Sequence, residues 1–163
     1  MCSRATRAVE MSEMFVRHAE AGDEETLRSH RVEARRESSR YRGEPWSPGH
    51  ENPIHGEKST VVYVAGIGET VFGSVAASNG GDTLWWIDHV FVEEPARGVG
   101  LGDALMTALV GELRSRGATR LGSSAQPGDR SLKNLYERHG LVARTILVGR
   151  DLSDPSSGAG ASR

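Results

Sequence analysis

The segment Arg-Gly-Val-Gly-Leu-Gly at residues 97–102 joins one permanent cation to three glycines spaced two apart. An apolar stretch typical of a strand precedes it, and a helical pattern of apolar residues follows it. The start of a helix exposes backbone N–H groups without partners and about half a unit of positive charge from aligned peptide dipoles. Glycines remove the side chains that would hold a bulky anion away, and Arg97 adds a cation. The segment therefore predicts a site for a phosphate or diphosphate group.

Two other kinds of glycine-rich turn fit this segment less well. A nucleotide P-loop requires Lys and then Ser or Thr after its last glycine, but Asp103 and Ala104 occupy these positions. A dinucleotide-binding turn that begins at Gly98 requires Gly or Ala at position 103, and no acidic residue ends the next expected strand to hold a ribose. One interpretation without a ligand stays open, in which the glycines serve only a tight turn between strand and helix.

The first half of the chain predicts mainly strands. Residues 13–20 predict a short strand, and residues 22–43 predict a helix with a weak apolar face. A loop with three prolines and three glycines follows. Three runs separated by short turns then predict an antiparallel meander of strands. These runs are residues 59–66, 70–78 and 83–92.

The second half predicts helices that alternate with short strands. Apolar residues recur at steps of three and four after residue 99, which indicates a helix with one apolar stripe. Residues 119–125 have a weak strand pattern, and residues 128–140 predict a short helix that Asp129 can cap. Residues 141–152 predict one or two final strands. A meander followed by crossover units predicts a mixed sheet with helices on both faces.

The composition bounds the class of protein. The chain has 163 residues, a formal net charge of −2 and a sequence pI near 6.3, which give no general attraction to nucleic acid or anionic membranes. The single cysteine, Cys2, excludes a disulfide framework and a multi-cysteine metal site. No apolar run could span a bilayer, and residues 1–10 lack the apolar core of a secretory signal, so we expect a cytoplasmic protein. We expect one domain at residues 11–152, with disordered ends at 1–10 and 153–163.

Two segments of the chain resemble a known family. Arg97, Gly100 and Gly102 form the pattern Arg-x-x-Gly-x-Gly after the run IDHVFVEEPA. This arrangement resembles motif A of the GNAT superfamily, the acyl-CoA-dependent N-acetyltransferases. The later run DRSLKNLYERHGL is similar to the late helix of the family, and the two segments occur in the family's order. The residues that match this helix are Leu135, Tyr136 and Gly140, and those that replace its usual Asn, Ala and Phe are Asp129, Leu132 and Leu141.

The resemblance implies a fold and a co-substrate. The fold is α/β, of the mixed α+β kind, with a mostly antiparallel sheet of six to seven strands and helices on both faces. The co-substrate is acetyl-CoA, whose diphosphate would bind the amides of the glycine segment and whose pantetheine would pair with the preceding strand, where a backbone N–H would stabilise the oxyanion. The residues that we expect to contact the cofactor are Val90, Phe91, Val92, Arg97, Gly98, Val99, Gly100, Leu101, Gly102, Asp103 and Asn134.

The resemblance also implies a reaction. An acetyl group would pass directly to a primary amine in a ternary complex, without a covalent enzyme intermediate and without a metal. We expect a small-molecule or peptide amine as acceptor, with no nucleic acid or membrane partner, and homodimers are common in the family. A CoA-binding or regulatory module without turnover is the alternative. His50 and His55 lie near glutamates, but histidines in a proline-rich loop are usually solvated, so we expect no metal site there.

Three residues are candidates for proton transfer. Tyr136 occupies the position of the family's general acid, although a tyrosine here could instead only pack the last helix on the sheet. Asp88 is the first candidate for the base, acting through a water, and His89 is its rival because an ordinary histidine pKa suits proton transfer near neutrality. Strand alternation predicts that Asp88, Val90 and Val92 share one face and that His89 lies on the other. A polar patch without a catalytic role is the alternative for both.

Overall fold

The computed structural model describes residues 13–41 and 59–144, and these ranges form a five-stranded sheet in the order β1-β2-β3-β4-β5. The first four strands pair antiparallel, and β5 runs parallel to β4. The predicted meander and the mixed sheet are therefore confirmed. The strands are β1 (Met14–His18), β2 (Thr60–Ile67), β3 (Thr70–Asn79), β4 (Leu84–Val92) and β5 (Arg120–Gly122). The helices are α1 (Glu24–Ser39), α2 (Leu101–Ser115) and α3 (Arg130–Arg138), and 3₁₀ turns lie at Ala21–Asp23 and Glu94–Ala96.

Some sequence predictions concern other parts of the chain. The predicted disordered ends, most of the proline-rich loop with His50 and His55, and residues 145–152 of the predicted final strands lie outside the described residues. The structure therefore shows five strands in its described part, compared with the six to seven that we expected. Residues 141–144, where the final strands were predicted to begin, have no regular secondary structure.

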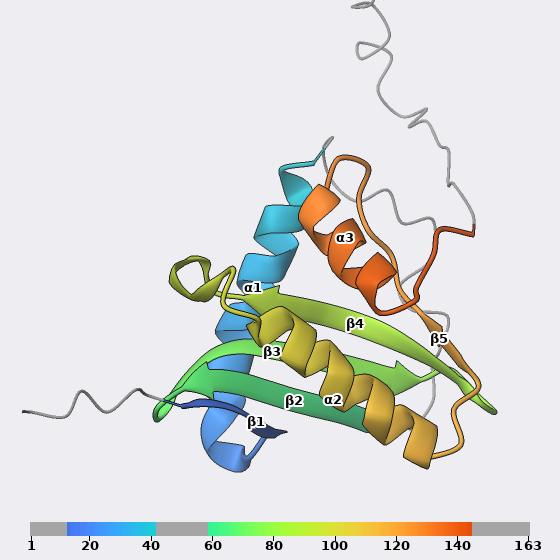
Figure 1. Ribbon diagram of the computed structural model, residues 1–163, viewed down its shortest axis with the longest axis horizontal. Coiled ribbons are helices and arrows are strands. Elements are labelled where there is room, and N and C mark those ends of the chain that lie inside the picture. The colour runs from blue at the N-terminus through green and yellow to red at the C-terminus, as the bar shows by residue number, and fades with distance from the viewer. Residues whose placement is uncertain (1–12, 42–58, 145–163) are drawn as a thin grey trace, which may run out of the picture.

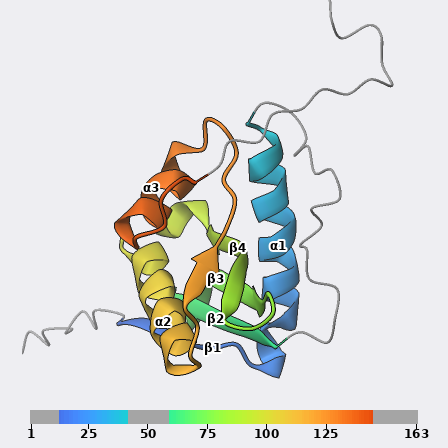
Figure 2. The same ribbon diagram turned by 90° about the vertical axis from the view of Figure 1, so that its right-hand side faces the viewer.

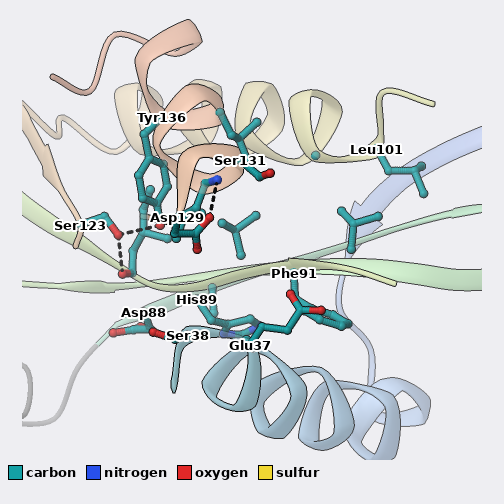
Figure 3. A pocket seen from close by; sticks show the side chains of 18 of the residues that line it. Glu37, Ser38, Asp88, His89, Phe91, Leu101, Ser123, Asp129, Ser131 and Tyr136 are labelled. Carbon is teal, nitrogen blue, oxygen red and sulfur yellow. Dashed lines mark hydrogen bonds between the residues drawn. The ribbon is translucent and has the colours of Figure 1, made fainter. Parts of the chain in front are cut away.

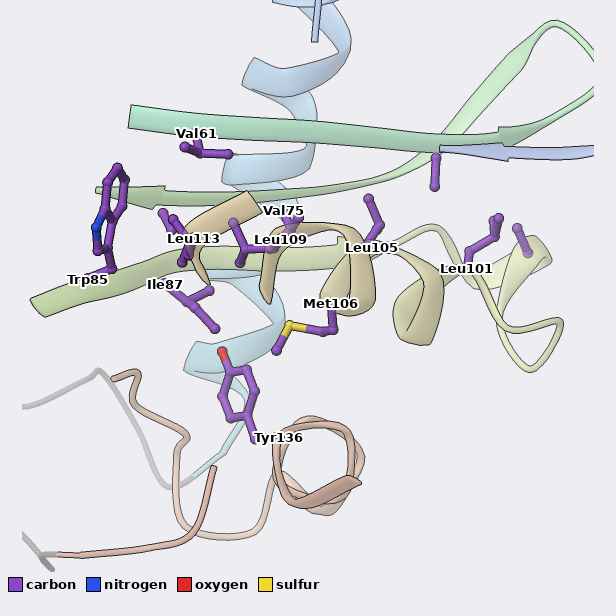
Figure 4. Close-up of a cluster of buried hydrophobic side chains, with 13 residues drawn as sticks. Val61, Val75, Trp85, Ile87, Leu101, Leu105, Met106, Leu109, Leu113 and Tyr136 are labelled. Atoms are coloured by element: carbon purple, nitrogen blue, oxygen red, sulfur yellow. The ribbon is translucent and has the colours of Figure 1, made fainter. Parts of the chain in front are cut away.

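The helices cover both faces of the sheet, as predicted (Figures 1 and 2). Helix α1 lies on one face, and α2 and α3 lie on the other. The apolar stripe of α2 is fully buried against the sheet, as Figure 4 shows. Burying a Leu side chain contributes roughly 1.5–3 kcal/mol, so this stripe fixes α2, and the glycine turn before it, on the sheet. The buried residues of the stripe are Leu101, Leu105, Met106, Leu109 and Leu113.

Helix α1 has a weaker apolar face, and its buried residues are Leu27 and His30. A histidine therefore faces the sheet where a larger apolar residue would be usual. Its ring lies 5.1 Å from that of Phe91 on β4, measured between ring centroids. This helix thus brings an ionisable side chain beneath the strand that precedes the glycine turn.

Candidate functional site

Strands β4 and β5 pair over only three positions and then separate. Their last pair is Trp86 with Gly122. The Ser123 hydroxyl lies 3.3 Å from the carbonyl oxygen of Ile87, the next residue of β4. In the described part of the chain, β4 from Asp88 onward pairs with β3 alone. An exposed strand edge of this kind can accept an extended chain of amides by strand addition.

A pocket of about 1120 Å³ lies along this edge of β4 (Figure 3). Its walls come from α1, β4, the glycine turn and α3. Every expected site residue lines it except Val99, whose side chain is 54% exposed. The structure therefore brings together residues from the two segments that resemble the GNAT family. The lining residues that we expected are Asp88, His89, Val90, Phe91, Val92, Arg97, Gly98, Gly100, Leu101, Gly102, Asp103, Asn134 and Tyr136.

The glycine turn lines the pocket, and it contains backbone N–H groups at the start of α2. Gly98 and Gly100 adopt left-handed conformations, with φ of +81° and +97°, that L side chains rarely adopt. A Cβ atom at either position would meet nothing within 4 Å, so backbone conformation rather than crowding requires glycine here. Within the described ranges, no backbone carbonyl accepts a hydrogen bond from the N–H groups of residues 98–103. These donors, at the positive end of α2, fit a diphosphate.

The side chain of Arg97, at the start of the glycine turn, already forms hydrogen bonds within the protein. Its Nε donates to the carbonyl oxygen of Val92 at 2.7 Å, and its Nη2 donates to Oε1 of Glu37 at 2.6 Å. The guanidinium also lies over the ring of Phe91, 5.7 Å from the centroid. Glu37 is not among the site residues that we expected from the sequence. A contact between α1 and the glycine turn has no local sequence signal, so Glu37 was missed.

Tyr136 projects from α3 toward the point where β4 and β5 separate. Its phenol oxygen lies 2.8 Å from the Ser123 hydroxyl. Burial raises the pKa of Tyr136 to about 12, because the phenolate would lose its solvation. The side chain is therefore a neutral phenol at neutral pH and keeps a proton to donate. Asp129 caps the same helix by accepting a hydrogen bond from the N–H of Leu132 at 3.0 Å, as predicted.

The predicted alternation along β4 is wrong at Asp88. Ile87 pairs with Ala77 and His89 pairs with Ala76, so Asp88 is the extra residue of a β-bulge. A bulge shifts the following side chains to the opposite face. Asp88 therefore lies on the α1 side together with His89, as Figure 3 shows, and does not share a face with Val90. Its Oδ1 accepts a hydrogen bond from the Ser78 hydroxyl at 2.9 Å.

His89 is largely buried between β4 and α1. Burial lowers the pKa of His89 to about 4, and the positive charges of Arg31 and Arg35 on α1 add to this effect. The imidazole is therefore neutral at pH 7. Its Nε2 lies 3.1 Å from the hydroxyl of Ser74 on β3. A neutral imidazole in the pocket wall can accept a proton through its other ring nitrogen.

Asp103, in the first turn of α2, holds α3 against the glycine turn. Its two carboxylate oxygens accept hydrogen bonds from Nε and Nη2 of Arg138, both at 3.0 Å. Nε2 of His139 lies 3.0 Å from Oδ1 of the same carboxylate. The hydrogen bond from Arg138 is the main cause that lowers the pKa of Asp103. Asp103, which we expected to contact the cofactor, is thus already paired with the side chains of Arg138 and His139.

The two adjacent tryptophans of β4 divide between core and pocket. Trp85 is buried in the core, whereas Trp86 lines the pocket. Asn134, an expected cofactor contact, also lines the pocket. The described residues contain no cluster of three His, Cys, Asp or Glu that could hold a metal. In the same ranges, no helix is both long and apolar enough to cross a bilayer.

The family follows from a comparison with known proteins. The model of the acetyltransferase (GNAT) family matches residues 25–141, which include α1, the open edge of β4, the glycine turn and α3. The chain therefore belongs to the GNAT family of acetyltransferases. A comparison with curated protein sequences finds no match.

Solved structures share the fold at low sequence identity. One is the aminoglycoside N-acetyltransferase AAC(6')-Iy with the bisubstrate analog CoA-S-monomethyl-acetylneamine, with a TM-score of 0.62 and 18% identity over 86% of this chain and 99% of that one. Another is a predicted acetyltransferase from Clostridium acetobutylicum with acetyl-CoA, with a TM-score of 0.61 and 17% identity over 86% and 97%. A third is the aminoglycoside acetyltransferase meta-AAC0020 from a soil metagenome, with a TM-score of 0.59 and 13% identity over 85% and 94%. At these identities the likeness concerns the fold alone.

Proposed function

We propose that the protein transfers an acetyl group from acetyl-CoA to the primary amine of a small molecule in a ternary complex. One observation carries this proposal. In the described ranges, the N–H groups of residues 98–103 have no backbone acceptor, and they lie beside the open edge of β4. A diphosphate fits the first feature, and the amides of a pantetheine arm fit the second. Two of the structurally similar proteins are aminoglycoside acetyltransferases, which supports a small-molecule amine as acceptor.

The side chains then take separate roles. Acetyl-CoA supplies the activated acyl group when it is bound. Tyr136, a buried phenol with its proton, donates to the departing thiolate. His89 is our choice as base, because its imidazole is neutral and lines the pocket, whereas Asp88 already accepts a hydrogen bond from Ser78. A cytoplasmic location and a homodimer stay predictions.

The experiment is cofactor binding by calorimetry, followed by release of free thiol with acetyl-CoA and a panel of amines. Gly100→Glu places a carboxylate where the diphosphate would bind and forces a side chain into a left-handed conformation, so we expect it to abolish CoA binding. Gly111→Glu is the matched control, because Gly111 lies within α2 where an added Cβ meets nothing within 4 Å. No CoA binding by the wild type at high micromolar concentration would refute the proposal.

If the wild type binds CoA but releases no thiol with any amine, the chain is instead a CoA-binding module. Tyr136→Phe then has no turnover to reduce. The two functions are thus separated by turnover, and both are separated from a plain structural turn by CoA binding.

A further inference from the structure

Four side chains form a continuous hydrogen-bonded chain beneath β4. His89 Nε2 lies 3.1 Å from the Ser74 hydroxyl, and that hydroxyl lies 2.9 Å from His30 Nδ1. His30 Nε2 in turn lies 3.1 Å from Oε1 of Glu93. The chain therefore joins β4, β3, α1 and the residue that follows β4.

This chain runs from the pocket to the surface. His89 lines the pocket, and the Glu93 side chain is 40% exposed at the other end. The two middle residues are enclosed, with Ser74 fully buried and His30 only 1% exposed. Buried polar groups cost free energy unless they are hydrogen-bonded, and an apolar pair would fill the same space more cheaply. A fully connected polar chain at this position calls for a role beyond packing.

The carboxylate of Glu93 and a neutral His30 together set the direction of the hydrogen bonds. An ionised carboxylate only accepts hydrogen bonds, so His30 donates to Glu93 from Nε2. In a neutral His30 the other nitrogen, Nδ1, is then an acceptor, and the Ser74 hydroxyl donates to it. The Ser74 oxygen accordingly accepts from Nε2–H of His89. This leaves Nδ1 of His89 as the ring nitrogen with a free electron pair.

We propose that Glu93, acting through His30 and Ser74, holds His89 in its Nε2–H tautomer so that Nδ1 accepts the proton of the attacking amine. The inference rests on the proposed function and deepens it. His89 is the residue that meets the substrate, and Glu93, His30 and Ser74 are positioning residues. The aspartate in the Ser-His-Asp arrangement of proteases plays a comparable part, because its carboxylate sets the tautomer and orientation of the histidine.

Atoms and protons balance in this step. The amine nitrogen forms a bond to the acetyl carbon, the carbon–sulfur bond breaks, His89 Nδ1 takes a proton from that nitrogen, and Tyr136 gives a proton to the thiolate. Exchange with solvent afterwards removes the proton from His89 and restores that of Tyr136. A weak base is sufficient, because an amine N–H becomes far more acidic as its nitrogen bonds to the acetyl carbon. The low basicity of His89 is therefore compatible with this step.

Other charged groups around His89 set limits on its titration. Arg31 and Arg35 on α1 face it and disfavour an imidazolium, and His30 is joined to it through Ser74. Asp88, its neighbour on β4, lies on the same side of the strand. We therefore expect kcat to show no inflection near pH 6.5, and kcat/KM to rise with pH toward the pKa of the acceptor amine.

The first test needs neither substrate nor cofactor. In ¹⁵N-histidine NMR spectra of the full chain at pH 7, we expect His89 and His30 to be neutral with the proton on Nε2. Ser74→Ala should leave His89 as a mixture of its Nδ1–H and Nε2–H tautomers. Glu93→Gln should likewise give a mixture of tautomers at His30. Glu94→Gln is the matched control, because Glu94 is the exposed neighbour of Glu93 and should change neither spectrum. A proton on Nδ1 of His89, or a His30 imidazolium, in the wild type would overturn the inference.

The second test measures turnover. We expect Ser74→Ala and Glu93→Gln to lower kcat about tenfold while KM and CoA affinity stay within about twofold. This is less than the roughly 10²–10⁴-fold contribution of a general base, because His89 itself remains. Ser74→Thr, which keeps the hydroxyl, should recover most of the lost kcat. Unchanged kcat in both variants would overturn the inference and leave the acetyltransferase proposal intact. If the wild type shows no turnover, the acetyltransferase proposal fails. The NMR spectra would still show whether His89 is held in its Nε2–H tautomer.

Discussion

Nη2 of Arg97 donates a hydrogen bond to Oε1 of Glu37 at 2.6 Å, and the two residues are 60 positions apart in the chain. The contact ties the last turns of α1 to the segment that we propose for diphosphate binding. Because Glu37 pairs with the only side-chain cation of the segment Arg97–Gly102, it competes with an anionic ligand for that charge. Removing the charge of Glu37 should therefore change the affinity for CoA.

Glu37→Gln should tighten CoA binding by up to about fivefold, because a partly exposed ion pair contributes about 0.2–1 kcal/mol that the ligand would no longer have to replace. Calorimetric titration of CoA measures this. Glu33→Gln is the matched control, since Glu33 lies on the same helix and pairs with Arg36 instead. Weaker binding by Glu37→Gln would show that Arg97 does not contact the diphosphate.

Tyr136→Phe should lower kcat about a hundredfold or more, because the departing thiolate would lose its proton donor. The ring that packs against the core is retained, so CoA affinity should be unchanged. Initial rates of thiol release at saturating acetyl-CoA test the prediction. Tyr63→Phe serves as control, because its phenol hydrogen-bonds His18 outside the pocket. Equal kcat values for Tyr136→Phe and the wild type would reduce Tyr136 to a packing residue.

His89 should make the folded state less stable in mild acid. Its pKa is about 4 in the fold and about 6.5 in an unfolded chain, so the unfolded chain binds the proton more tightly between these values. The stability that comes from keeping His89 neutral is fully present above about pH 6.5. It is lost as the pH falls from about 6.5 to about 4, and no more is lost below that pH. The shift corresponds to about 3 kcal/mol in the free energy of unfolding. Urea unfolding at pH 7 and pH 4.5 should show this loss in the wild type, and a His89→Gln variant with the same loss would contradict it.

The pair of Asp103 and Arg138 should contribute modestly to the docking of α3. Both side chains are about half exposed, so a double-mutant cycle with Asp103→Asn and Arg138→Gln should give only a small favourable coupling. Arg138 lowers the pKa of Asp103 in the fold, so the coupling should be present at neutral pH and disappear as the pH falls below the usual range of a carboxyl group. Thermal unfolding at pH 7 and pH 3 measures both values. A coupling that does not change with pH would show that the charge of Asp103 is not involved.

The sequence was sufficient for the elements whose cause is local. The glycine turn at residues 97–102, the apolar stripe of α2 and the cap at Asp129 each depend on residue types within a few positions, and the structure has them where we predicted. The mixed sheet followed from the order of these elements. The candidate site residues except Val99 line one pocket, because the two segments that resemble the GNAT family supplied them, and their roles stay predictions.

The contacts that determine chemistry could not be predicted in this way. The bulge at Asp88 arises from the register between β3 and β4, and no residue in the run IDHVF marks it. Ser74 and His30 are 44 positions apart, and each alone is an unremarked polar residue in a strand or helix. The hydrogen bond between Ser123 and Tyr136 forms only because the fold places the end of β5 beside α3. Hydrogen-bond partners over such separations depend on tertiary structure.

The three-residue length of β5 has a kinetic consequence. In the described part of the chain, β4 and β5 separate after the pair of Trp86 and Gly122, so the space between them forms when the chain folds. An incoming ligand has no hydrogen bonds of a β4–β5 ladder to break there. We therefore expect CoA to associate in a single phase whose rate rises linearly with its concentration. If β5 continued to pair with β4, these backbone hydrogen bonds would have to break before CoA could bind. The observed association rate would then level off at high CoA concentration.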